Sequence, residues 1–158
     1  MKQPKRKTLT QTQRMAVYEK CQGHCAYCGT EIAYKQMQVD HVTPMEHAHF
    51  ARQNGKTVHD LENLLPACRP CNYIKSSMFL EKFREIIPGW VDVLHRDSVT
   101  YRNAVRFGMV TETPELPKFY FEKIGLDVPD YTAEMNQMYR EAREMLRKKR
   151  EEAQHDGV

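Results

Sequence analysis

The sequence has no long apolar run and only a small excess of one charge sign. None of its apolar stretches approaches the roughly 18 residues that a membrane helix requires, and no apolar signal segment follows the basic residues at its start. We therefore expect a cytoplasmic chain without a membrane span. The net charge of +3 is too small to identify a nucleic-acid partner by itself.

Basic residues are nevertheless concentrated at the two ends of the chain. They crowd the first twenty residues, where Lys5, Arg6 and Lys7 are consecutive, and they recur from Arg147 to Arg150. A basic arm can neutralise DNA phosphates, but such a run is more often just solvated. The arm alone leaves a nucleic-acid partner undecided.

The cysteines are odd in number and regularly spaced. Five cysteines in a reducing compartment do not suggest a disulfide framework. Four of them form two C-x-x-C pairs, Cys25 with Cys28 and Cys68 with Cys71, and two such pairs can complete a tetrahedral thiolate site. We predict a structural Zn²⁺ there, with a rubredoxin-like iron site or two disulfides as alternatives. The remaining Cys21 is expected to be a small buried residue.

The pattern before and between the cysteine pairs predicts one helix and then short segments. Thr10 and Gln13 have the form of a capping box, so a helix should begin there and run to about Lys20. From residue 21 to residue 76, glycine and proline punctuate the chain, which indicates turns and brief strands.

Helical spacing returns after the second cysteine pair. Helices are predicted at residues 79–87, 99–107 and from Thr132 onward. The aromatic residues 119–121 should form a short strand or a segment laid across the core. The apolar stripe of the last helix can pack on the chain's own core or pair with a second subunit, so monomer and homodimer both stay open.

Three short segments around the cysteine pairs resemble the HNH endonuclease motif. The acid–histidine pair Asp40-His41 is followed by Asn63-Leu64 before the second cysteine pair, and Asn72 stands directly after the last cysteine. Over roughly residues 14–84 the chain therefore resembles HNH endonucleases, in the phage and bacterial subgroup with a four-cysteine zinc site. The resemblance implies hydrolysis of DNA phosphodiester bonds in a bacterial or phage-infected host cell.

The resemblance also implies a role for each motif residue. His41 would be the general base that removes a proton from water, because imidazole is a competent base at neutral pH. Asp40 and Asn72 would offer oxygen ligands to a catalytic Mg²⁺ or Mn²⁺. Asn63 would hydrogen-bond the backbone on the far side of the loop and so fix His41.

Basic side chains are candidates for holding double-stranded DNA. Lys75 lies one helical turn beyond Asn72, so its charge could hold a phosphate. Lys5, Arg6 and Lys7 would add phosphate contacts from the arm.

Each motif residue also has an ordinary explanation. Asp40 and His41 could form a surface ion pair, Asn63 could favour a turn, and Asn72 could cap a helix. Neighbours on a strand point to opposite faces, so Asp40 and His41 share a site only if the strand ends or twists there. Asparagine at position 72, where histidine is frequent, leaves the metal preference open.

The predicted fold is therefore small and α+β. Two short antiparallel strands and a helix would form a ββα-metal core over residues 14–84, closed by the zinc site, after a basic arm at residues 1–13 and before a mainly helical extension at residues 85–158. The predicted function is a metal-dependent HNH endonuclease. The alternatives are a non-catalytic zinc-dependent nucleic-acid-binding protein and an iron-containing electron carrier, which would be coloured.

Overall fold

The centre of the fold is a two-stranded antiparallel sheet with a short helix packed on it. A computed structural model describes residues 8–113 and 115–155, so the basic run Lys5–Lys7 lies outside the described residues. Strand β1 (Gln38–His41) pairs with β2 (Leu64–Ala67), and α3 (Arg69–Lys75) begins after one intervening residue. This is the predicted arrangement of two strands and a helix, and the α+β class is confirmed.

The helix before the sheet is the one that the capping box predicts. Thr10 and Gln13 each accept a hydrogen bond from the other's backbone N–H at the start of α1 (Gln11–Glu19). On its inner face, the fully buried Val17 belongs to a cluster with Ile32, Met37 and Leu64. α1 therefore covers one side of the sheet through apolar contact.

The connection between the two strands contains more helix than the sequence predicts. Its elements are η2 (Met45–His47), α2 (Ala48–Gln53) and η3 (Leu61–Asn63), and a further short helix, η1 (Tyr34–Gln36), stands just before β1. An isolated helix as short as α2 is marginal in water, and packing stabilises it here. Phe50 on α2 contacts Phe79 and Tyr131, whose ring centroids lie 5.8 and 6.4 Å from its own. Distant chain segments thus decide the local structure.

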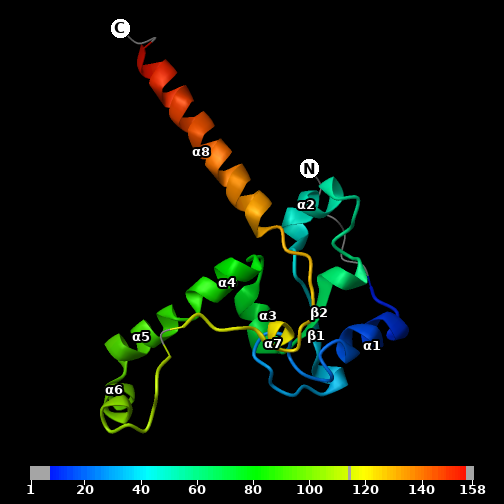
Figure 1. The fold of residues 1–158 in the computed structure, drawn as a ribbon, viewed down its shortest axis with the longest axis vertical. Coiled ribbons are helices and arrows are strands. Elements are labelled where there is room, and N and C mark those ends of the chain that lie inside the picture. Colours follow the sequence, from blue (N-terminus) through cyan, green and yellow to red (C-terminus); the bar gives the residue numbers. More distant parts are fainter. Residues whose placement is uncertain (1–7, 114, 156–158) are drawn as a thin grey trace.

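The second half of the chain is mainly helical. Its helices are α4 (Leu80–Ile86), α5 (Gly89–Asp97), α6 (Val99–Arg106), α7 (Tyr120–Lys123) and α8 (Thr132–His155). α4 ends close to the predicted boundary at residue 87, and Pro88 then stands at the N-cap of α5, a helix that the sequence did not indicate. Figure 1 shows that α5 and α6 lie at one extremity of the molecule, whereas α8 projects from another side.

The prediction of a strand at residues 119–121 is wrong, although the segment does cross the core. Phe119 is the N-cap of the short helix α7. The backbone N–H groups of Tyr120 and Phe121 donate to the carbonyls of Tyr27 and Ala26, at 3.0 and 2.9 Å. These bonds fasten α7 to the first cysteine turn, so the C-terminal half contributes to the main core.

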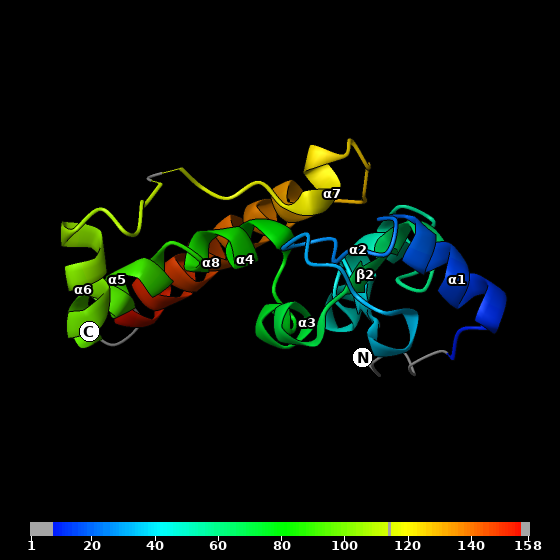
Figure 2. The same ribbon diagram turned by 90° about the horizontal axis from the view of Figure 1, so that it is seen from below.

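The long helix α8 packs on the core only at its beginning. Met135 and Met138 contact the cluster that contains α2, whereas Met145 and Leu146 are 60% and 61% exposed. Figure 2 shows the molecule from below, with α1 and α8 toward opposite ends of the view. Among the described residues, no helix has the length and apolar character needed to cross a membrane.

Candidate functional site

Two tight turns bring the four paired cysteines together. At the first turn the Gly29 N–H donates to the Cys25 carbonyl at 2.9 Å, and Gly29 adopts φ of +76°, a conformation that glycine takes without strain. At the second, Cys68 is the N-cap of α3 and Cys71 lies in its first turn. The Ala26 N–H donates to the Pro66 carbonyl at 2.8 Å, which ties the first turn to β2.

The sulfur positions fit a tetrahedral metal ion. The four ligand atoms all lie within 4.8 Å of one another, and the Sγ atoms of Cys28 and Cys68 are 3.8 Å apart. A zinc ion with Zn–S bonds of about 2.3 Å at tetrahedral angles separates its sulfurs by about 3.8 Å, whereas a disulfide needs about 2.05 Å. The cluster can therefore hold a metal such as zinc, and the two-disulfide alternative does not apply.

The thiols of the cluster differ in their pKa. A hydrogen bond from Cys71 lowers the pKa of the Cys25 thiol to about 4, whereas the same hydrogen bond raises the pKa of Cys71 and burial raises the pKa of Cys68. The thiolate is the form that binds metal. Cys21 lies outside the cluster and is fully buried, as predicted, and burial raises its pKa to about 11. Cys21 is therefore a packing residue.

Asp40 lies in a buried network on the α3 side of β1. The Lys75 ammonium lies 2.9 Å from Asp40 Oδ2, and the Tyr27 hydroxyl donates to the same oxygen. Asp40 is 6% exposed and Lys75 0%. Burial raises the pKa of the Asp40 carboxyl, and the Lys75 charge offsets part of this effect. Lys75 also donates to the His41 carbonyl at 2.8 Å, so the network reaches the backbone of the predicted base.

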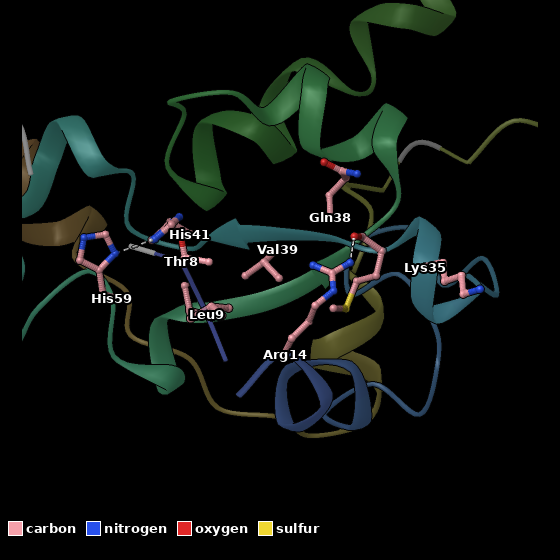
Figure 3. A pocket seen from close by; sticks show the side chains of 10 residues that line it. Thr8, Leu9, Arg14, Lys35, Gln38, Val39, His41 and His59 are labelled. Atoms are coloured by element: carbon pink, nitrogen blue, oxygen red, sulfur yellow. Dashed lines mark hydrogen bonds between the residues drawn. The ribbon is translucent and has the colours of Figure 1, made fainter. Parts of the chain in front are cut away.

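The side chain of His41 lies in a different environment from that of Asp40. It lines a groove of about 480 Å³ together with His59, Arg14 and Lys35, and its Nε2 lies 3.3 Å from Nδ1 of His59. Figure 3 shows the two imidazoles facing each other beyond the end of β1, with Val39 and Leu9 along the groove. The described residues that line this groove include no carboxylate, so its fixed charge is positive.

Asn63 clamps the backbone that follows His41. Its Oδ1 accepts from the Thr43 N–H at 2.8 Å, and its Nδ2 donates to the carbonyls of Thr43 and Val58 at 3.2 and 2.8 Å. The side chain is buried, at 3% exposure, and such fully used amides hold a loop firmly. One amide thereby ties the backbone at Thr43, just after His41, to the backbone at Val58.

The predicted pair of magnesium ligands does not fit a hydrated ion in this arrangement. Asn72 lies within α3, half-buried, so it does not cap that helix. The Asp40 carboxylate is almost fully enclosed and already binds an ammonium and a phenol. Mg²⁺ normally keeps several of its waters, whereas Asp40 is only 6% exposed.

Lys75 is buried beside Asp40, whereas the sequence predicted a side chain that contacts a DNA phosphate. A phosphate contact requires an exposed ammonium, and the Lys75 side chain is fully buried. Its position one turn beyond Asn72 is as expected, but that face of α3 packs against β1. Lys75 therefore neutralises Asp40 in this arrangement.

Two residues of the site carried no signal in the sequence. Tyr27, inside the first C-x-x-C pair, supplies a hydroxyl to Asp40 from a ring packed among Phe83, Phe119 and Phe121. His59 stands outside the recognised segments and reaches His41 only through the fold of the strand connection. Neither contact follows from spacing, because both join segments that are separate in the chain.

Comparison with known proteins supports this description of the core. The family model for HNH endonuclease matches residues 25–77, so this segment is an HNH domain, and the predicted resemblance is confirmed there. A solved structure of the Type II-C Cas9 enzyme from Actinomyces naeslundii is 25% identical to this chain, with a TM-score of 0.39. That match covers 51% of this chain and 9% of the Cas9 chain. A comparison with curated proteins found no match.

Proposed function

We propose that this chain is an endonuclease that hydrolyses phosphodiester bonds of double-stranded DNA, with His41 as the general base. The observation that carries the proposal is the position of His41 at the end of β1 in a groove with Arg14 and Lys35. A groove with fixed positive charge attracts the DNA backbone. The HNH match over residues 25–77 supports the choice of a hydrolytic reaction.

The proposed step needs a base and a positioned water. His41 removes a proton from water as the water oxygen attacks phosphorus. The bond from phosphorus to the 3′ oxygen breaks, and that oxygen takes up a proton from solvent, which leaves 5′-phosphate and 3′-hydroxyl ends. Asn63 and Lys75 hold the backbone on either side of His41, and such support keeps a base within catalytic geometry.

We further propose that cleavage requires a divalent cation, Mg²⁺ or Mn²⁺, as is expected of an HNH domain. Asn72 remains a candidate ligand, whereas Asp40 is engaged by Lys75. The rate of plasmid nicking, measured over a series of Mg²⁺ concentrations, tests whether Asn72 is a ligand. The Asn72→Ala variant should need more Mg²⁺ than the wild type without a change in its melting temperature. If the Asn72→Ala variant shows the wild-type dependence on Mg²⁺, Asn72 is not a ligand of the catalytic metal.

Nicking of supercoiled plasmid by the His41→Ala variant tests the central proposal. General-base catalysis contributes about 10² to 10⁴ in rate, so the variant should nick far more slowly while it keeps its zinc and its DNA affinity. His49→Ala is the matched control, because His49 lies in α2 with its ring against that of Phe50 and does not line the groove. A repurified His41→Ala variant that nicks at the wild-type rate would overturn the mechanism.

The second candidate function is a zinc-dependent DNA-binding protein without hydrolytic activity. The observation that favours it is the engagement of Asp40 by Lys75, which leaves the predicted metal pair incomplete. Such a protein would bind plasmid but would not nick it at any Mg²⁺ or Mn²⁺ concentration. The same nicking assay therefore separates the two functions.

A further inference from the structure

We infer that His59 is a positioning residue that holds His41 in the tautomer with its proton on Nε2, an inference that rests on the proposed function. The two imidazoles meet nitrogen to nitrogen, with His41 Nε2 3.3 Å from His59 Nδ1. Their ring planes are inclined by 76° and the ring centroids are 5.4 Å apart. Both rings line the groove that contains Arg14 and Lys35, and Figure 3 shows them facing each other.

The chemistry of neutral imidazole decides the direction of this hydrogen bond. A neutral ring has one nitrogen that donates and one that accepts, so one of the two facing nitrogens must carry the proton. If His59 Nδ1 donated, His41 would carry its own proton on Nδ1 and its only lone pair would be occupied by His59. A general base needs an available lone pair. The proposed function therefore requires His41 Nε2–H to donate to His59 Nδ1, which places the lone pair of His41 on Nδ1.

The chain around His59 is held firmly enough to fix such a bond. On one side of His59, the Val58 carbonyl accepts from Asn63 Nδ2 at 2.8 Å. On the other side, Asp60 accepts from the backbone N–H and the hydroxyl of Thr57, at 2.8 and 2.7 Å. The turn that presents His59 is thus tied at both neighbours.

The same amide links this turn to the chain that follows His41. Asn63 bonds the Thr43 backbone as well as the Val58 carbonyl, so one side chain sets the spacing between the segments that present the two imidazoles. Partners that orient a functional imidazole through its second nitrogen fix its tautomer. His59 has the place and the chemistry of such a partner.

Nitrogen-15 NMR of histidine-labelled, zinc-loaded protein tests the inference directly, without DNA. Above the pH at which the imidazoles protonate, His41 should show a protonated Nε2 and an unprotonated Nδ1. In the His59→Leu variant this preference should weaken to a mixture of tautomers. A wild-type His41 protonated on Nδ1 would overturn the inference, whether or not the protein cuts DNA. The wild-type spectrum decides this even if a variant folds poorly.

Plasmid nicking by His59 variants distinguishes a positioning role of His59 from a purely structural one. Orienting partners of this kind typically contribute about 10- to 100-fold, so the His59→Leu variant should lose roughly that factor in kcat with little change in KM. The His59→Asn variant should recover most of the rate, because asparagine Oδ1 can accept a hydrogen bond close to the place of Nδ1. His49→Leu is the matched control and should nick at the wild-type rate.

Two other outcomes would contradict a positioning role. If His59→Asn nicks as slowly as His59→Leu while both keep the wild-type melting temperature, His59 does more than accept a hydrogen bond. If the wild type holds a second transition-metal ion that His59→Leu loses, the two imidazoles bind that metal and do not bond each other. A third result concerns the proposed function alone. If the wild type does not nick plasmid but shows the expected His41 tautomer, the proposed nuclease activity is refuted and the imidazole contact stands.

Discussion

The two sides of β1 present adjacent residues to opposite environments. On the inner side, Asp40 is enclosed with Lys75 and Tyr27, close to the turns that hold the cysteines. On the outer side, His41 is half-buried in a groove with cationic side chains. The inner groups satisfy one another's charges and hydrogen bonds, whereas the outer groups can meet a substrate. Adjacent motif residues can thus serve stability and chemistry separately.

Strand geometry explains the separation. Successive side chains of a strand point to opposite faces, and both residues are within the paired part of β1, opposite Leu65 and Leu64. The strand therefore does not end early enough for the two side chains to share a site. A charged residue that faces the core needs a partner, and Lys75 from α3 supplies it.

The largest effect on the inner side should follow removal of one zinc ligand. Zinc binding contributes about 10 to 16 kcal/mol in small zinc-dependent peptides, which is comparable to the whole stability of a typical domain. The Cys71→Ser variant should therefore lose zinc in metal analysis and lose its cooperative thermal transition. Cys21→Ala is the matched control, because Cys21 is buried outside the cluster, and it should keep one zinc per chain. Full zinc content in Cys71→Ser would refute the four-cysteine assignment.

A smaller but still large loss of stability should follow removal of the buried ammonium. Taking one partner from a buried ion pair typically costs about 3–5 kcal/mol, because the other charge stays buried without compensation. The Lys75→Met variant should therefore unfold at lower denaturant concentration than the wild type. Lys35→Met, at an exposed position in the groove, should have little effect on unfolding.

A double variant separates the ion pair from simple packing. Adding Asp40→Asn to Lys75→Met removes the uncompensated charge, so the free energy of unfolding should partly recover. If the two substitutions destabilise additively, the network on the inner side does not exist as described. The comparison between the two sides of β1 would then have no energetic basis.

Much of the framework was predictable because its signals are local. The capping box located α1, the C-x-x-C spacing located the metal cluster, and the segment 38–75 contained the strands and the helix of the HNH motif. The helices at 80–86, 99–106 and from Thr132 follow apolar periodicity. Each of these patterns depends on residues within a few turns of one another.

The parts that were missed depend on contacts between distant segments. α2 is stabilised by Phe79 and Tyr131, and residues 119–121 form the beginning of a helix because α7 bonds the first cysteine turn. The partners of Asp40 and His41, Lys75 and His59, lie 35 and 18 positions further along the chain. No periodicity connects such pairs, so the placement of Lys75 in the core could not be foreseen.

The smallest predicted effect concerns the outer side and the basic arm. Thr8, the first described residue, lines the same groove as His41. Each phosphate contact adds about 0.9 to the slope of log affinity against log salt concentration on duplex DNA. Removal of residues 1–7 should therefore weaken binding to all duplex sequences alike and reduce that slope, without any change in zinc content or unfolding.

The matched control replaces Arg143 and Lys148 by glutamine on α8, which projects away from the sheet (Figure 1), and it should leave the slope unchanged. Equal slopes for the truncated and full-length chains would show that the groove binds DNA without the arm, and would leave Arg14 and Lys35 as its proposed phosphate contacts.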